Sequence, residues 1–336
     1  MQDSTARTRI TKSSSALLIR LGGLLAFVLL TTEIFWRLAG WGPAINDIEL
    51  WMATRARVNN DSNAVVLLGS SRVLCGLHPD VLNRELLGYR TYSLAVSGAD
   101  PMPVLEDLAR DTKFRGTVVC ENVEAQGFER YPFRQLPRPL EFAQSPLPDA
   151  FKKLFYFASA QLTSRRNSAW GLMSTLGQAG QTADTTTASR FVPLRYTAGD
   201  AVLQRRRNRV RLLERYQTWK RQAPYSTDES VLAQVPKWVA QIRARGGNVV
   251  FVRMPTGGDV QRLSASLYGE YAKQFATQFK PYVDCDNEPA LKGFASTDES
   301  HLDADAALEF SVAFARTLRE RNLVGSSAIK TASRRR

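Results

Sequence analysis

Five short apolar runs alternate with helical patterns along most of the chain, and this alternation restricts the fold more than any other feature. Continuously apolar strands separated by helices are typical of a parallel sheet with helices on both faces. The sequence therefore predicts a three-layer α/β/α fold of the flavodoxin-like kind. The expected strands are Ala64–Leu68, Thr91–Val96, Thr117–Cys120, Asn248–Met254 and Tyr282–Cys285. The expected helices are Pro79–Leu87, Val104–Asp111, Glu229–Arg245, Val260–Phe279 and Asp303–Arg321.

The alternation is interrupted between the third and fourth expected strands, over approximately residues 126–225. A proline-rich loop comes first, followed by a polar segment at residues 177–189 and a basic helix at Leu203–Lys220. We interpret this stretch as a helical insertion. It is either a lid over the carboxyl edge of the sheet or a solvated decoration, and the sequence leaves both readings open.

An apolar stretch near the N-terminus, residues 16–40, predicts a transmembrane signal anchor. Its uncharged part, Leu21–Thr32, is shorter than the ~20 residues that a bilayer span needs. Arg20 and Arg37 extend the span, because long basic side chains reach toward the headgroups, whereas Glu33 opposes insertion. A cleaved signal peptide is the alternative, although no good small-residue cleavage pattern follows the apolar run.

Basic residues precede this stretch, in a predicted cytoplasmic tail at residues 1–15. Arg7, Arg9 and Lys12 place the N-terminus inside the cell by the positive-inside rule. The expected protein is a single-pass protein of the bacterial inner membrane. Its α/β domain, residues 41–325, would be periplasmic, and residues 326–336 would form a basic flexible tail.

The net charge of +13 is concentrated in two places. Residues 150–225 hold fourteen Lys or Arg against three acids, and residues 321–336 add five basic residues and no acid. Such patches suit anionic partners such as phospholipid headgroups, acidic polysaccharide or nucleic acid. Nucleic acid is the weakest of these, since the sequence has no recognition motif and an exported domain seldom meets it.

Cysteines and histidines are too few and too dispersed to predict a metal site. Cys75, Cys120 and Cys285 form no CxxC pair, and His78 and His301 are the two histidines of the chain. A zinc site needs clustered ligands, so we expect no metal and no cofactor. We interpret the cysteines as buried free thiols, and His78 as a capping or surface residue.

Polar residues follow the first two expected strands. Gly69, Ser70 and Ser71 follow the first, at the sheet edge where doubly wound folds bind ligands. Ser97 and Gly98 follow the second, where a glycine lets a backbone N–H approach a ligand, as an oxyanion hole requires. Taken singly, the first segment is better explained by a plain turn, and the second has a strand-to-helix turn as its alternative.

A third polar segment, residues 296–302, precedes the last expected helix. A serine nucleophile needs an imidazole to take its proton, and the imidazole needs a carboxylate to hold its tautomer. Asp298 and His301 are three residues apart on one loop, so they can form this pair locally.

The three segments together resemble the SGNH (or GDSL) hydrolase superfamily. In that family Gly-x-Ser follows the first strand, a glycine follows the second, and Asp-x-x-His precedes the last helix. The resemblance implies that Ser71 is the nucleophile, that Asp298 and His301 complete a triad, and that Gly98 donates an oxyanion N–H. The family's Gly-x-Asn-Asp block reads Cys-Glu-Asn-Val here, and Asn122 is carried over from it as a further oxyanion donor.

The resemblance predicts a serine esterase or O-acyltransferase, because membrane-anchored relatives with a Gly-Ser-Ser start are similar to proteins that esterify cell-envelope polymers. The expected substrate is an acylated glycan or lipid, with a membrane-bound partner as a candidate acyl donor. Arg72 and Arg253 are candidate ligands for a substrate carboxylate or phosphate, with a structural ion pair as the alternative for each. The rival interpretation is a non-catalytic envelope protein whose basic insertion binds an anionic polymer or a membrane partner.

Overall fold

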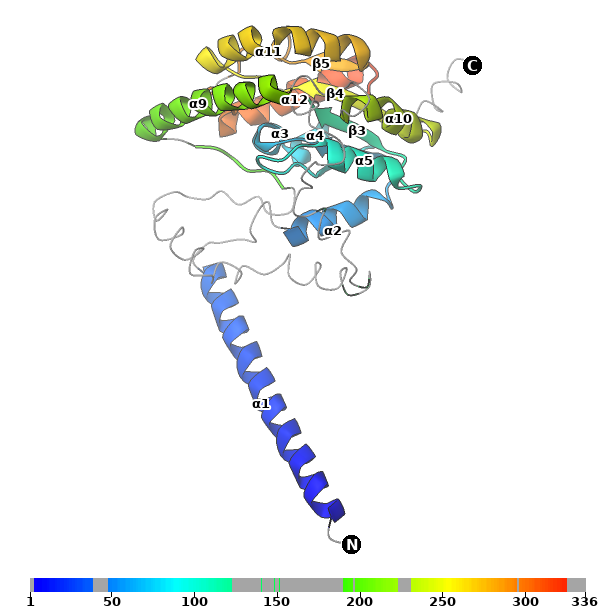
Figure 1. Ribbon diagram of the computed structural model, residues 1–336, viewed down its shortest axis with the longest axis vertical. Helices are drawn as coiled ribbons and strands as arrows, with labels where there is room; N and C mark the ends of the chain where they lie inside the picture. Colours follow the sequence, from blue (N-terminus) through cyan, green and yellow to red (C-terminus); the bar gives the residue numbers. More distant parts are fainter. Residues whose placement is uncertain are drawn as a thin grey trace. The chain divides into compact units, whose positions relative to one another are not determined.

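Among the residues that the computed structural model describes, five strands form one parallel sheet (Figure 1). Those residues are 3–38, 48–122, 190–195, 197–222, 231–294 and 296–324, with 140, 148 and 151 as single positions. The predicted α/β fold is confirmed. The strands are β1 (Ala64–Leu68), β2 (Arg90–Ser93), β3 (Thr117–Glu121), β4 (Asn248–Arg253) and β5 (Tyr282–Asp284), in the order β2-β1-β3-β4-β5.

Helices cover both faces of the sheet, which explains why every residue of β1 and β3 is buried. One face packs against α2 (Ile48–Val58), α5 (Met102–Arg110) and α10 (Val231–Ala244). Its apolar core includes Trp51, Val66, Leu105, Trp238 and Phe251. The burial of apolar strands on both sides is what the continuous apolar runs in the sequence predict.

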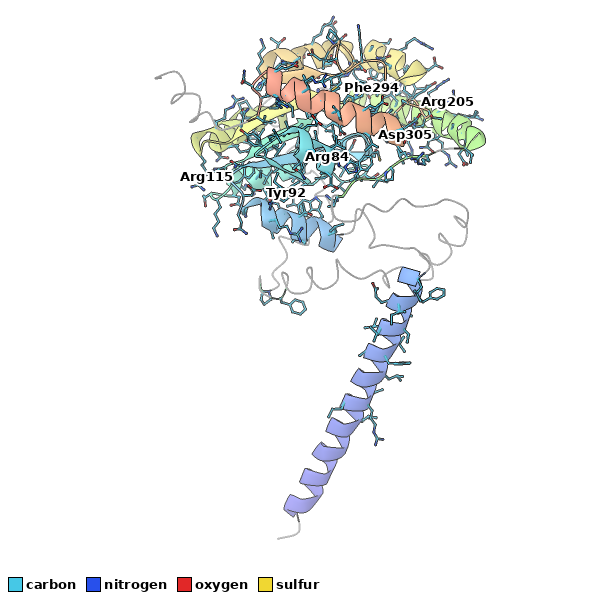
Figure 2. All side chains as sticks on the ribbon, turned by 180° about the vertical axis from the view of Figure 1, so that it is seen from behind. Arg84, Tyr92, Arg115, Arg205, Phe294 and Asp305 are labelled. Carbon is cyan, nitrogen blue, oxygen red and sulfur yellow. The ribbon has the colours of Figure 1, made fainter. Side chains whose placement is uncertain are left out.

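The opposite face packs against α3 (Ser71–Gly76), α4 (Pro79–Glu85) and α12 (Ala304–Glu320). Figure 2 shows α12 across this face with Phe294 beside it, and the Phe294 ring meets Phe310 edge-on at 5.4 Å between ring centroids. The short helix α3 was not predicted, because six residues are too few to show a helical period. His78 caps α4, where its Nδ1 accepts a hydrogen bond from Asp80 N–H (3.2 Å), so the predicted capping role is confirmed.

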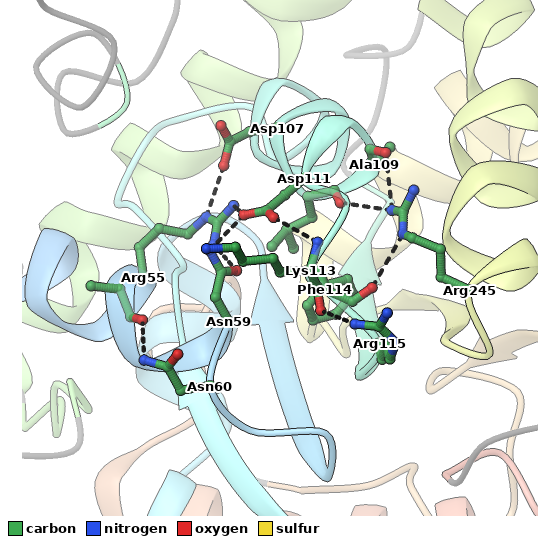
Figure 3. A network of polar contacts seen from close by, with 12 residues as sticks. Arg55, Asn59, Asn60, Asp107, Ala109, Asp111, Lys113, Phe114, Arg115 and Arg245 are labelled. Atoms are coloured by element: carbon green, nitrogen blue, oxygen red, sulfur yellow. Dashed lines mark hydrogen bonds and ion pairs between the residues drawn. The ribbon is translucent and has the colours of Figure 1, made fainter. Parts of the chain in front are cut away.

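A polar network joins α2 to α5 on the first face (Figure 3). The Arg55 guanidinium donates to Asp107 (2.8 Å) and to Asp111 (2.9 Å), and Asn59 also donates to Asp111 (2.6 Å). Burial would raise the pKa of Asp111, but hydrogen bonds from the Lys113 N–H and from Arg55 outweigh it and lower that pKa. The network satisfies charges at the edge of the apolar core and fixes α2 on the sheet.

The order of the strands decides where a ligand can bind. β1 pairs with β2 on one side and with β3 on the other, so the chain reverses its direction of progress across the sheet at β1. In doubly wound folds the ligand crevice lies at the carboxyl ends of the strands beside this switch point. The residues that follow β1 and β3 are therefore the first place to look for a site.

Helix α9 (Ala198–Gln222) lies between β3 and β4 in the sequence and packs alongside α11 (Gly258–Gln278) (Figure 1). Leu212 of α9 is buried against Val260 and Tyr268 of α11. This confirms a helix within the predicted insertion. Most of residues 126–189, the proline-rich loop and the polar segment included, lie outside the described residues, as does the predicted tail at 326–336.

The N-terminal helix α1 (Asp3–Leu38) belongs to a unit separate from the one that holds the sheet. It is continuous, so the predicted division into a tail at 1–15 and a span at 16–40 corresponds to no break in the helix. Within the described residues, no helix combines the length and the apolar character needed to cross a membrane.

Candidate active site

Ser71 lies directly beyond the carboxyl end of β1, as the first residue of α3. Ser70 caps the helix, since its hydroxyl accepts a hydrogen bond from Arg72 N–H (3.4 Å). Its own backbone N–H donates to the buried Glu121 carboxylate at the end of β3 (2.6 Å). Two neighbouring parallel strands therefore hold the turn that presents Ser71, at the switch point of the sheet.

The structure brings Ser71, His301 and Asp298 into hydrogen-bond series. Ser71 Oγ lies 2.7 Å from His301 Nε2, and His301 Nδ1 lies 2.7 Å from Asp298 Oδ2. These are the contacts that a serine nucleophile, its base and the carboxylate that orients the base require. Residues 230 positions apart in the sequence meet because β1 and the loop before α12 end at the same edge.

The Asp298 carboxylate is fully buried yet held in its charged form. Burial would raise its pKa, but the hydrogen bond and charge of His301, with backbone hydrogen bonds from Ser300 and His301, lower that pKa to about 2. The two N–H groups donate to Asp298 Oδ1 at 2.8 and 2.7 Å. The charged carboxylate keeps the His301 Nδ1 proton in place, so that Nε2 faces Ser71 as an acceptor.

Gly98 lines the same cavity as Ser71 and His301. Its backbone lies in the left-handed region (φ 71°), which glycine adopts without steric cost. Because Ser71 is the first residue of α3, its own N–H has no acceptor within the helix. The two residues predicted to supply oxyanion donors therefore lie at one cavity.

Asn122 follows β3 but is not among the residues that line this cavity. Its backbone N–H donates to Val252 O (2.7 Å), which ties the residue after β3 to β4. The role of Asn122 in the oxyanion hole stays a prediction.

The two predicted substrate-binding arginines differ in position. Arg72 lines the cavity, and its Nε lies 3.5 Å from Ser300 Oγ. Arg253 does not line it and instead pairs with Asp284 at the end of β5 (3.6 Å) and with Asp286 just beyond that strand (3.3 Å). The structural ion pair, the alternative that the sequence left open, is the observed state of Arg253, because strands β4 and β5 are adjacent.

Helix α9 supplies site residues that the sequence did not single out. Asn208 Nδ2 donates to Asp298 O (3.0 Å), and Arg209 pairs with Glu299 (3.0 Å) and with Asp259 (2.5 Å). Arg211 lines the cavity together with Asn208. The signal in the sequence was the basic helix itself, but its period does not say which residues face the loop at 298–301.

Glu299 links the loop at 298–301 to the start of helix α11. It has a left-handed backbone (φ 65°), and its Oε2 accepts hydrogen bonds from the N–H groups of Asp259 (3.1 Å) and Val260 (3.3 Å) at the start of α11. Gly258 also has a positive φ (51°), and a Cβ there would lie 2.5 Å from the Glu299 carboxylate. Gly258 is therefore required for this close approach.

The three cysteines are free and buried, which confirms their predicted state. Burial, followed by the charge of Asp298, raises the pKa of the Cys75 thiol to about 12, so this thiol is no rival nucleophile. Within the described part of the chain, no group of His, Cys, Asp and Glu side chains could hold a metal ion.

The comparisons with family models and with curated proteins identified no relative of this chain. No family model matches the sequence, and no curated protein is similar to it. Arguments about function therefore depend on the site itself.

The depressed pKa of Asp298 predicts a specific dependence of stability on pH. A carboxyl group whose pKa is lowered on folding stabilises the fold above its ordinary pKa and loses that contribution as the pH falls toward the folded value. The lowering from 3.8 to about 2 corresponds to about 2 kcal/mol. Between pH 5 and pH 2, the free energy of unfolding should therefore fall by about 2 kcal/mol more in the unaltered chain than in Asp298→Asn. Urea unfolding at a series of pH values measures this, and parallel curves would contradict it.

Gly258→Ala should destabilise the protein by about 2–3 kcal/mol, because the methyl group is strained at positive φ and overlaps Glu299. The matched control is Gly269→Ala in the same helix, where a Cβ meets no atom within 4 Å. That change should stabilise by about 0.5–1 kcal/mol, since alanine favours a helix interior. Urea unfolding of both variants measures the change in the free energy of unfolding. Equal changes in the two variants would show that the close approach of Gly258 to Glu299 carries no strain.

Proposed function

We propose that the chain is a serine-dependent esterase or O-acyltransferase. The observation that carries the proposal is the series from Ser71 Oγ through both nitrogens of His301 to Asp298, with 2.7 Å at each step. A structural role gives no physical reason to align a hydroxyl, an imidazole and an ionised carboxylate at the ligand edge of a sheet.

The mechanism is acyl transfer through an acyl-enzyme. His301 Nε2 takes the Ser71 proton as Oγ attacks the ester carbonyl, and Asp298 stabilises the imidazolium that forms. The N–H groups of Ser71 and Gly98 receive the negative charge of the tetrahedral intermediate. His301 then protonates the leaving alcohol. Water releases the acyl group in a hydrolase, and a sugar or polymer hydroxyl releases it in a transferase.

Membership of the SGNH superfamily is part of this proposal. Its support is the order of the segments: Ser71 after β1, Gly98 after β2, and Asp298 and His301 before α12. Without an asparagine donor, the proposed oxyanion hole consists of the two backbone N–H groups of Ser71 and Gly98. The proposed substrate is an acylated cell-envelope glycan or lipid, with a membrane-bound protein as the candidate acyl donor.

We further propose that the α/β domain lies outside the cytoplasm of a bacterial cell. The support is the basic segment before the apolar run Leu21–Thr32, which directs export whether that run is retained as an anchor or cleaved as a signal.

Alkaline phosphatase fused after Arg336, a reporter that folds only outside the cytoplasm, should be active. A matched fusion that lacks residues 1–40 should be inactive. Alkaline carbonate extraction then separates a membrane-embedded chain from a peripheral or released one. Equal activity in both fusions would contradict export by the N-terminal segment.

Ser71→Ala should abolish labelling by a fluorophosphonate probe and lower hydrolysis of 4-nitrophenyl acetate at least ~10³-fold, because among the described residues no other hydroxyl is hydrogen-bonded to the His301 ring. Ser266→Ala, an exposed serine on α11, is the control and should label normally. Labelling retained in Ser71→Ala would move the nucleophile to Ser70 or elsewhere. An unlabelled and inactive unaltered chain would favour the non-catalytic reading, in which the basic insertion binds an anionic polymer.

A further inference from the structure

A cavity of about 70 Å³ opens beside the nucleophile, between the loop of the triad and helix α9. Ser71, His301 and Gly98 form its reactive side. Asn208, Arg211 and Leu212 of α9 line it as well, with Val260 at the start of α11. A substrate whose carbonyl reaches Ser71 must therefore place its adjoining groups against α9.

The charged side chains that line this cavity are all basic. Arg72 and Arg211 are among its lining residues, and no Asp or Glu is. Carboxylates that adjoin the lining residues are already engaged: Asp298 with His301, Glu299 with Arg209, and Glu121 with the N–H of Ser70. Such a lining attracts an anionic substrate electrostatically, whereas it gives a neutral or cationic substrate no electrostatic advantage in binding.

Arg211 differs from its neighbours on α9. Arg209 is held by two carboxylates, and Leu212 is buried against α11. Arg211 is exposed and forms no hydrogen bond or ion pair with any residue that the structure describes. The packing of α9 thus fixes the backbone of Arg211 at the cavity and leaves its guanidinium available for a ligand.

We propose that Arg211 determines substrate specificity by binding a carboxylate or phosphate group that the ester substrate carries close to its scissile bond. This inference rests on the proposed esterase or acyltransferase function and narrows its substrate to an anionic ester. A guanidinium suits this role because its planar N–H groups pair with two oxygens of a carboxylate or phosphate at once. The anionic group can belong to the acyl part or to the alcohol part of the ester, and in either case it would make the same kind of contact with Arg211.

The test uses the full chain and two pairs of esters. In the first pair the acyl part is varied: 4-nitrophenyl adipate monoester against its methyl ester. In the second pair the alcohol part is varied: 4-acetoxybenzoate against methyl 4-acetoxybenzoate. For each pair the ratio of kcat/KM, anionic over neutral, is measured in the unaltered chain, in Arg211→Gln and in Arg211→Lys. Dividing the ratio of a variant by that of the unaltered chain cancels the intrinsic reactivity of the esters.

The expected result is a roughly tenfold lower ratio in Arg211→Gln for at least one pair, mainly through KM, with an intermediate value in Arg211→Lys. The pair that responds identifies the side of the ester that carries the anion. Raising the salt concentration should lower the ratio in the unaltered chain more than in Arg211→Gln. Arg206→Gln is the matched control, since Arg206 is exposed on α9 and does not line the cavity, and it should keep the ratio of the unaltered chain.

Unchanged ratios in Arg211→Gln for both pairs, with ester hydrolysis present, would overturn the inference and leave the esterase function standing. An equal fall of the ratio in Arg206→Gln would also overturn it, because the effect would then be long-range charge. Absence of hydrolysis of all four esters and of fluorophosphonate labelling in the unaltered chain would overturn the proposed function, and the inference with it.

Discussion

The contact between Asp298 and His301 depends on a carboxylate that stays ionised inside the protein. Removing a charged carboxylate from water is costly unless hydrogen bonds replace the lost hydration. Asp298 receives two backbone N–H groups and the imidazole, and these outweigh the effect of burial on its pKa. The orientation of His301, and through it the contact with Ser71, follows from this one stabilised charge.

The loop that carries Asp298 is in turn braced by two helices. Asn208 of α9 binds the Asp298 carbonyl, and Glu299 binds the N–H groups that open α11. Arg209 joins the two helices through Glu299 and Asp259. A helix of the insertion thus helps to hold the triad and also forms one wall of the cavity. The lid interpretation gains support for the described part of the insertion, in that α9 contacts the site.

Sequence patterns predicted the sheet well because burial on both faces requires continuously apolar strands, and those runs are visible without any structure. His301 was a candidate base because the chain has two histidines, and Asp298 because it lies three residues away on the same loop. The choice of Ser71 as their partner came from the resemblance to the SGNH superfamily. Arg253 and Asn122 do not line the cavity beside Ser71. Arg253 ends β4 and forms the ion pair that the sequence had left open, with Asp286 after the adjacent strand β5, and this partner is fixed by strand adjacency.

The sequence by itself determined that the chain forms a parallel α/β sheet, and it singled out one serine, one histidine and one aspartate as candidates for a common site. These properties depend on local periodicity and on residue chemistry. The tertiary structure alone decided which face of α9 meets the loop at 298–301, and hence that Asn208 binds the Asp298 carbonyl while Arg211 lines the cavity beside Ser71. A basic helix has the same sequence pattern whichever way it is rotated, and only packing against α11 selects the rotation.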